Sequence, residues 1–148
     1  KWKGKIPAGS GIDQPVIALD LLPTFVEAAG GKGPLDWSLD GRSFLALLDG
    51  KLKTTSVVDV PRPLFWRQGG SGGPRAMREG KWKIVHDRKA GDEPALFDLS
   101  QDIGEARDLA KENGEVLKAM LGKLNVWEKQ LEEPRWGPGA SGKNSKKK

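Results

Sequence analysis

Residues 75–86 read RAMREGKWKIVH and have the pattern of a β-hairpin. Apolar and polar residues alternate along both halves of this stretch, and the Glu-Gly pair between them is typical of a turn. Met77, Trp82 and Ile84 are the side chains that we expect on the buried face of the hairpin. The stretch therefore predicts a small antiparallel sheet.

Two shorter apolar runs, at residues 64–66 and 95–99, extend this sheet to three or four strands. Residues 114–132 form the longest predicted helix, with Asn113 as its N-cap and Pro134 after its end. Apolar residues recur along this helix at helical spacing; they are Val116, Leu117, Met120, Leu121, Leu124, Trp127 and Leu131. We expect this stripe to pack across the sheet, which makes the predicted fold class α+β.

The N-terminal 63 residues have a different pattern, with helices separated by loops. Residues 20–30 predict a helix, because Asp20 is a suitable N-cap and Gly30 can adopt the left-handed conformation that ends a helix. Residues 43–48 predict a second, shorter helix.

Composition excludes several classes of site. The chain has 148 residues, no cysteine and one histidine. Disulfides, thiolate zinc sites, cysteine nucleophiles and multi-histidine metal sites are therefore excluded. No run approaches the roughly 20 apolar residues that a transmembrane helix needs, so no membrane span is predicted.

The net charge of +5 is concentrated at the C-terminus, where Lys143, Lys146, Lys147 and Lys148 carry four of the positive charges. Residues 134–148 are predicted to be a disordered basic tail. The six tryptophans fall at predicted core positions and are not interleaved with lysine and arginine. Nucleic acid is therefore not a predicted partner.

A glycine-rich loop, residues 69–73, precedes the hairpin. It lacks the Gly-Lys-Ser/Thr ending of a phosphate-binding loop, and we interpret it as a flexible surface loop. Guanidinium groups beside it suit sulfate, phosphate or carboxylate. The candidate substrate-binding rim is formed by Arg67, Gln68, Ser71 and Arg75. The alternative is that these arginines belong to a solvated face of the hairpin.

No other pattern indicates catalysis or metal binding. His86 has no nucleophile motif near it, as a general base would need. The acidic residues Asp98, Asp102, Glu105 and Asp108 lack the spacing of a calcium loop. We interpret them as turn and cap residues.

Short motifs recur in a definite order along the chain: WKGKIPAG at 2–9, DQPV at 13–16, LDLLPT at 19–24, AAG at 28–30, DGRS at 40–43, LLDG at 47–50, RAMREGKWK at 75–83 and LFDL at 96–99. This order resembles the C-terminal third of the sulfatase family, in its arylsulfatase-like branch. Phe97 stands where tyrosine is usual in that family, Ile103 where proline is common and Asp108 where asparagine is common.

The resemblance implies a parent protein with the alkaline-phosphatase-like fold. Residues 1–63 would be an edge segment of its large α/β domain. Residues 64–133 would be its C-terminal subdomain, a small antiparallel sheet backed by a long helix, followed by the tail at 134–148.

The resemblance also implies that the parent hydrolyses sulfate esters with a formylglycine and a calcium ion. The family signature, Cys or Ser followed by x-Pro-x-Arg, does not occur here, and no position matches a catalytic or metal-binding residue of the family. We therefore predict that this chain binds no cofactor and is inactive alone. The implied partners are the remainder of the sulfatase chain and, as substrate of the parent, a sulfated small molecule or glycan.

The alternative function is a stand-alone module that binds anions or sulfated glycans. Family members often act outside the cytoplasm, in the periplasm or after secretion, but this sequence indicates no compartment.

Overall fold

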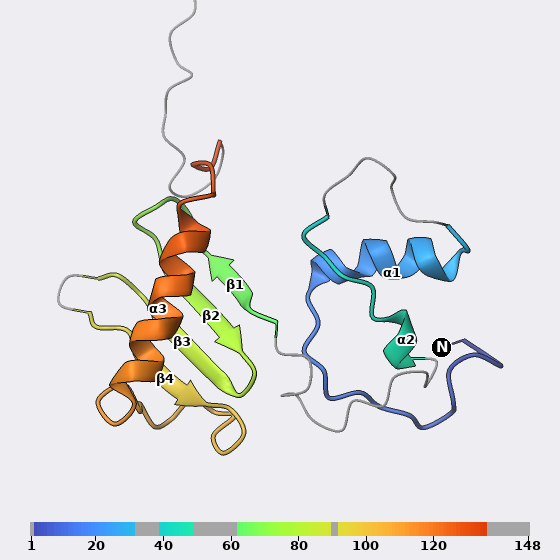
Figure 1. Cartoon of the computed structure of the whole chain (residues 1–148), viewed down its shortest axis with the longest axis horizontal. Helices are drawn as coiled ribbons and strands as arrows, with labels where there is room; N and C mark the ends of the chain where they lie inside the picture. The colour runs from blue at the N-terminus through green and yellow to red at the C-terminus, as the bar shows by residue number, and fades with distance from the viewer. Residues whose placement is uncertain (1, 32–38, 49–61, 90–91, 136–148) are drawn as a thin grey trace, which may run out of the picture. The chain divides into compact units, whose positions relative to one another are not determined.

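The structure, a computed structural model, describes residues 2–31, 39–48, 62–89 and 92–135 of the chain. These residues belong to two compact units, Lys1–Pro61 and Arg62–Lys148 (Figure 1). Most of the predicted basic tail, residues 136–148, lies outside the described residues. In the described ranges no helix is both long and apolar enough to cross a bilayer.

The first unit contains three short helical elements. They are η1 (Ala18–Asp20), a 3-10 helix, α1 (Leu21–Ala28) and α2 (Leu45–Leu48). The helices predicted at residues 20–30 and 43–48 are thus present. Gly30 has φ of 80°, the left-handed conformation expected of a residue that ends a helix.

Asp20 does not cap α1 with its side chain, so this detail of the prediction is wrong. Its carboxylate accepts from the backbone N–H of Ile17 (3.0 Å) and from that of Arg42 (2.8 Å). The hydroxyl of Thr24 donates to the carbonyl of Asp20 (2.6 Å) and accepts from the N–H of Phe44 (3.1 Å). The two buried polar side chains therefore join α1 to residues 39–48.

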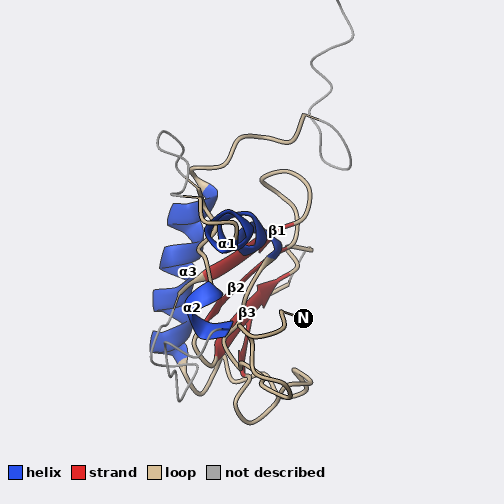
Figure 2. Ribbon diagram, turned by 90° about the vertical axis from the view of Figure 1, so that its right-hand side faces the viewer, coloured by secondary structure: helices blue, strands red, loops and turns tan. Residues whose placement is uncertain are grey.

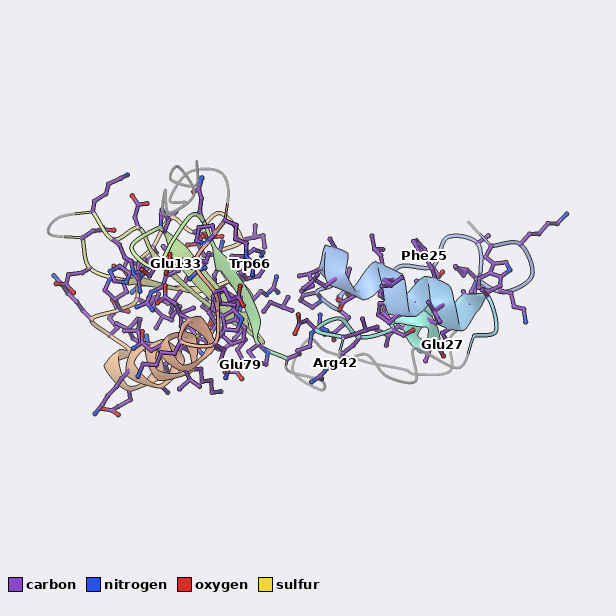
Figure 3. The ribbon with its side chains drawn as sticks, turned by 90° about the horizontal axis from the view of Figure 1, so that it is seen from above. Phe25, Glu27, Arg42, Trp66, Glu79 and Glu133 are labelled. Atoms are coloured by element: carbon purple, nitrogen blue, oxygen red, sulfur yellow. The ribbon has the colours of Figure 1, made fainter. Side chains whose placement is uncertain are left out.

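The 3-10 helix η1 and helix α1 share an exposed apolar face. Leu19 is 56% exposed and Phe25 is 63% exposed, with Leu21 and Leu22 between them. Figure 3 shows Phe25 and the charged Glu27 on opposite sides of the helix. Because soluble proteins rarely expose contiguous apolar side chains, this face has the character of a contact surface.

The second unit contains a four-stranded antiparallel sheet and one long helix. The strands are β1 (Leu64–Arg67), β2 (Arg75–Glu79), β3 (Trp82–His86) and β4 (Ala95–Asp98), paired in the order β1-β2-β3-β4. The helix is α3 (Gly114–Glu128). The predicted hairpin, sheet and α+β class are confirmed.

Helix α3 covers one face of this sheet, as Figures 1 and 2 show from two directions. The strand register places one residue from each strand in a row across the sheet: Phe65, Met77, Ile84 and Leu96. The last three of these are completely buried, as is Leu124 of α3, and Met120 of the same helix is buried beside them. The predicted burial of Met77 and Ile84 is confirmed, whereas Trp82 is partly buried at the margin of this core.

Both ends of α3 differ from the prediction. Asn113 occupies the N-cap position, but its side chain donates to the carbonyl of Leu109 (3.4 Å) and does not cap the helix. The helix ends at Glu128 and not at residue 132, because the next hydrogen bonds join residues three apart, as in turns. Glu132 contacts Arg67 at the end of β1, and Glu133 contacts the loop between β1 and β2.

Candidate functional site

The glycine-rich loop, here residues 68–74, joins β1 to β2 and is held by backbone hydrogen bonds. Gln68 N–H donates to the carbonyl of Pro74 (2.8 Å), and Gly73 N–H donates to that of Gly70 (2.8 Å). A Cβ atom at Gly73 would lie 1.8 Å from the carbonyl oxygen of Gln68. The loop therefore needs glycine at position 73 to close.

The tip of the loop is attached to the chain beyond α3. The N–H of Ser71 lies 3.2 Å from each carboxylate oxygen of Glu133, and the carbonyl of Ser71 accepts from the guanidinium of Arg88. Arg67 donates to the carbonyl of Glu132 (2.7 Å). These contacts favour a fixed shape over the flexible one that the glycine content predicts.

A shallow hollow of about 530 Å³ lies at this loop. It is lined by residues 68–74 of the loop and by Glu133. Two of the four predicted rim residues, Gln68 and Ser71, therefore line the hollow, and both are exposed.

The other two rim residues, Arg67 and Arg75, are directed to the helix and its C-terminal extension. Arg75 is only 7% exposed and donates to Asn125 (2.7 Å) and to Glu128 (2.8 Å). The alternative interpretation of Arg75 as part of a solvated face is therefore wrong. A buried guanidinium needs such partners, because burying an unpaired charge is very costly.

Glu128 is the centre of this ionic network. Besides Arg75 it binds Arg88 through two contacts, of 2.9 and 2.6 Å. Burial raises the pKa of Glu128, but the hydrogen bond and charge of Arg88 and the charges of Arg75 and Arg67 outweigh it, so the pKa is lowered. Burial and the charge of Arg88 lower the pKa of Arg75, which nevertheless stays protonated.

Sequence patterns did not indicate Arg88, Glu128 or Glu133 as part of this region. Glu128 lies 53 residues from Arg75 and 40 from Arg88, and Glu133 lies 62 residues from Ser71. No local spacing could reveal these pairs. The one signal was the cluster of arginines on either side of the loop, because guanidinium groups suit carboxylates as well as sulfate and phosphate.

His86 lies opposite Arg75 in the β2–β3 ladder. Its Nδ1 atom and the Nε atom of Arg75 are buried without a hydrogen-bond partner among the described atoms. A general base must reach a proton of the substrate. The burial of this ring nitrogen therefore does not favour catalysis by His86.

Two of the acidic residues after β4 bind backbone groups, whereas the carboxylate of Glu105 pairs with the ammonium group of Lys83. Asp102 accepts from the N–H groups of Ala106 (2.7 Å) and Arg107 (2.9 Å), and Asp108 accepts from those of Leu96 (3.0 Å) and Ala110 (2.9 Å). Within the described ranges, no three His, Asp or Glu side chains come together as a metal site requires. The described residues do not fit a calcium ion.

Replacing Gly73 with Ala should open the loop, because the new Cβ would collide with backbone. We expect loss of about 1–3 kcal/mol of stability and faster exchange of the Gln68 and Gly73 amide protons. Gly72→Ala is the matched control, since no atom lies within 4 Å of its added Cβ. Equal hydrogen-exchange rates in the two variants would contradict this account of the loop.

Acid should weaken the second unit, because Asp98 and Glu128 both have lowered carboxyl pKa values. For Asp98 the causes are hydrogen bonds from Lys81 and Ser100. A carboxyl whose pKa is lower in the folded state stabilises the fold above its unfolded pKa, about 4, and this contribution is lost as pH falls through the folded pKa. Urea midpoints measured from pH 7 to pH 2 should fall below about pH 5.

The variants Asp98→Asn and Glu128→Gln should each flatten this acid dependence. Glu112→Gln is the control, because the pair of Glu112 with Arg107 is exposed. Acid curves for the first two variants that run parallel to that of the unchanged chain would show that these carboxyls do not cause the loss.

The chain is similar in sequence to several known proteins. No model of a known protein family matches it. Arylsulfatase D of Homo sapiens is 29% identical over 156 aligned residues, which cover 84% of this chain and 25% of that protein. An uncharacterized sulfatase of Schizosaccharomyces pombe is 33% identical over 122 residues, covering 78% of this chain and 22% of that protein.

Solved structures are similar as well. A putative sulfatase from Bacteroides thetaiotaomicron matches 81% of this chain and 29% of that chain, with a TM-score of 0.54 and 26% sequence identity. The crystal structure of Ps i-CgsB matches 91% of this chain and 29% of that chain, with a TM-score of 0.72 and 29% sequence identity. The chain thus spans between a quarter and a third of these two proteins, Arylsulfatase D and Ps i-CgsB. The matches agree in sequence and in fold over most of the chain. The chain therefore belongs to the sulfatase family and corresponds to the C-terminal part of its members.

Proposed function

We propose that this chain is the C-terminal part of an enzyme that hydrolyses sulfate esters. The observation that carries the proposal is the similarity to Arylsulfatase D, which is 29% identical over 84% of this chain. The remainder of the enzyme supplies the formylglycine, the calcium ion and the catalytic side chains.

The chain itself should be inactive alone. It contains no cysteine and no Ser-x-Pro-x-Arg sequence from which a formylglycine could be made. Its described acidic residues do not gather into a metal site. No step of sulfate-ester hydrolysis is therefore assigned to a residue of this chain.

The loop at residues 68–74 is our candidate for contact with substrate. Gln68 and Ser71 line its hollow and present an amide and a hydroxyl that can bind a sugar or sulfate oxygen. Arg67 and Arg75 act indirectly, because their contacts with Glu132 and with α3 hold the two ends of the loop. Gln68→Ala and Ser71→Ala should raise KM in an intact enzyme and leave folding unchanged.

The exposed apolar face of η1 and α1 is the proposed contact with the remainder of the enzyme. It is formed by Leu19, Leu21, Leu22 and Phe25. In this arrangement residues 1–63 form an edge segment of the large α/β domain. Burying this face against the remainder would stabilise the enzyme by about 25 cal/mol per Å² of apolar surface removed from water.

A sulfated glycan is the substrate class that the comparisons favour. Ps i-CgsB has been solved in complex with k-i-k-neocarrahexaose, and that structure matches this chain with 29% identity. An ulvan-active sulfatase of Formosa agariphila is 51% identical over 51 residues, covering 34% of this chain and 10% of that protein. Both names point to polysaccharide-derived substrates for those proteins.

A chimera tests the proposal. The chain replaces the corresponding C-terminal part of Arylsulfatase D. Hydrolysis of an aryl sulfate is measured for the chimera, for Arylsulfatase D truncated at the junction and for this chain alone. We expect turnover by the chimera and none by the other two. Turnover by this chain alone would overturn the assignment of the catalytic groups to the remainder, and a well-folded but inactive chimera would count against the proposed role.

A further inference from the structure

Arg88, two residues beyond the end of β3, has a backbone conformation that arginine rarely adopts. Its φ is 61°, in the left-handed region. This region is unfavourable for a residue with a Cβ atom, and such a residue stays there only when its surroundings hold it. Residues held in this way cluster at functional sites, so the contacts of Arg88 are candidates for a functional role.

The guanidinium of Arg88 joins two segments that are far apart in the sequence. It donates to both carboxylate oxygens of Glu128 on α3, at 2.9 and 2.6 Å, and to the carbonyl of Ser71 in the loop at residues 68–74. Its side chain is 18% exposed, so water competes little for these bonds. The fixed fork of donors on a guanidinium can serve both partners at once, which the compact ammonium group of a lysine does less well.

The ion pair with Glu128 does not by itself account for Arg88. Glu128 already has a buried partner in Arg75, at 2.8 Å. Burial and then the charge of Arg88 lower the pKa of Arg75, so the two guanidinium groups repel one another. A second arginine at Glu128 therefore brings repulsion as well as backbone strain. The bond to the loop is the contact that Arg88 makes and Arg75 does not.

Ser71 is held at both of its backbone polar groups. Its carbonyl accepts from Arg88, and its N–H lies 3.2 Å from each carboxylate oxygen of Glu133. These bonds fix the peptide groups on either side of Ser71, whose hydroxyl has no hydrogen-bond partner among the described residues. Two glycines precede Ser71 and two follow it, so the loop tip would have many conformations without these bonds.

We propose that Arg88 is a positioning residue for the loop at residues 68–74. Arg88 does not line the hollow at this loop. It holds the carbonyl of Ser71 and so keeps the Ser71 hydroxyl in the place where substrate meets it. The inference rests on the proposed function, because that function makes the loop a contact with substrate.

Hydrogen exchange in the whole chain tests the effect of Arg88 on the loop without any enzyme activity. In Arg88→Ala the amide protons of Gln68, Ser71 and Gly73 should exchange about tenfold faster, the effect of losing one hydrogen bond from a charged group. Amide protons of β2 and β3 report opening of the whole sheet. They should accelerate less, because Glu128 keeps Arg75 as a partner.

Arg88→Gly separates the loop contact from stability. Glycine adopts the left-handed conformation readily, so this variant should be at least as stable as Arg88→Ala while its loop exchanges equally fast. Glu105 provides the control, because it is the other non-glycine residue with a left-handed backbone in the described part of the chain, with φ of 56°. Its carboxylate binds Lys83 and not the loop. Glu105→Ala and Glu105→Gly should leave exchange in the loop unchanged.

Kinetics of the chimera with Arylsulfatase D test whether the loop position matters to substrate. Arg88→Ala should raise KM for an aryl sulfate about as much as Ser71→Ala and leave kcat within about twofold. The double variant should be little worse than Ser71→Ala alone, because residues that act through one another are not additive. A residue that only stabilised the fold would lower the amount of active enzyme, and so the apparent kcat, at unchanged KM.

Two results would overturn the proposal. The first is loop amides in Arg88→Ala that exchange as in the unchanged chain, or that accelerate only in parallel with those of the sheet. The second is a chimera in which Ser71→Ala raises KM and Arg88→Ala does not. Failure of the proposed function looks different: the chimera is inactive, or Ser71→Ala leaves its KM unchanged, while exchange in the whole chain still decides whether Arg88 holds the loop.

Discussion

Replacement of Leu124 by Ala is expected to lower the stability of the second unit by about 3–5 kcal/mol. Leu124 is fully buried and belongs to the cluster formed by Met77, Ile84, Leu96 and Met120. The change removes three carbon atoms from a site enclosed by the sheet and by the helix itself. The cavity that remains adds to the lost transfer free energy, because close-packed neighbours collapse only partly.

Chemical denaturation of the whole chain, followed by the fluorescence of its tryptophans, measures this loss. Val126→Ala is the control in the same helix, since Val126 is 60% exposed, and its effect should stay within about 0.5 kcal/mol. Amide protons of β2 and β3 should exchange faster only in the Leu124 variant. Similar losses for both variants would mean that α3 does not complete the core as described.

Replacement of Glu128 by Ala should cost about 3 kcal/mol, the usual result of breaking a buried ion pair from one side. Arg75 would keep Asn125 as a partner but would lose its counter-charge, and Arg88 would then repel it. Arg75 is 7% exposed and the side chain of Glu128 is 12% exposed, so water can replace little of the lost interaction.

The pair of Arg107 and Glu112 provides the comparison for Glu128→Ala. Their side chains are 72% and 55% exposed, and Glu112→Ala should cost less than about 1 kcal/mol. A second comparison is Glu128→Gln, which keeps hydrogen-bond acceptance and should cost less than Glu128→Ala. Equal losses of unfolding free energy for Glu112→Ala and Glu128→Ala in urea would mean that the network around Glu128 contributes no more to stability than an exposed ion pair.

The sheet and its core could be predicted because their signals are local. Met77 and Ile84 sit at alternating positions in two neighbouring strands, and Leu124 repeats at helical spacing with Met120. Each of these patterns needs only a few consecutive residues. The family resemblance could also be recognised from the sequence, because it depends on the order of short motifs.

The polar interior could not be predicted, because its partners are far apart in the sequence. Aspartate is a residue type that often caps helices, yet one of the partners of Asp20 is the N–H of Arg42, 22 residues later. Arg75 belongs to a stretch that alternates like a half-exposed strand, and only the return of α3 across the sheet buries it against Glu128. The contacts that hold the glycine-rich loop depend on the same return.

The chain order of the sheet has a consequence for the rate at which the second unit forms and opens. Each strand pairs with its neighbour in sequence, so the sheet can form by closing short loops, which favours rapid folding. The contact between Arg75 and Glu128 spans 53 residues and must wait until α3 docks. We therefore expect changes in the β2–β3 hairpin to slow refolding, and Glu128→Ala to leave refolding nearly unchanged and to accelerate unfolding. The ionic network would thus set the lifetime of the folded unit and not the speed of its assembly.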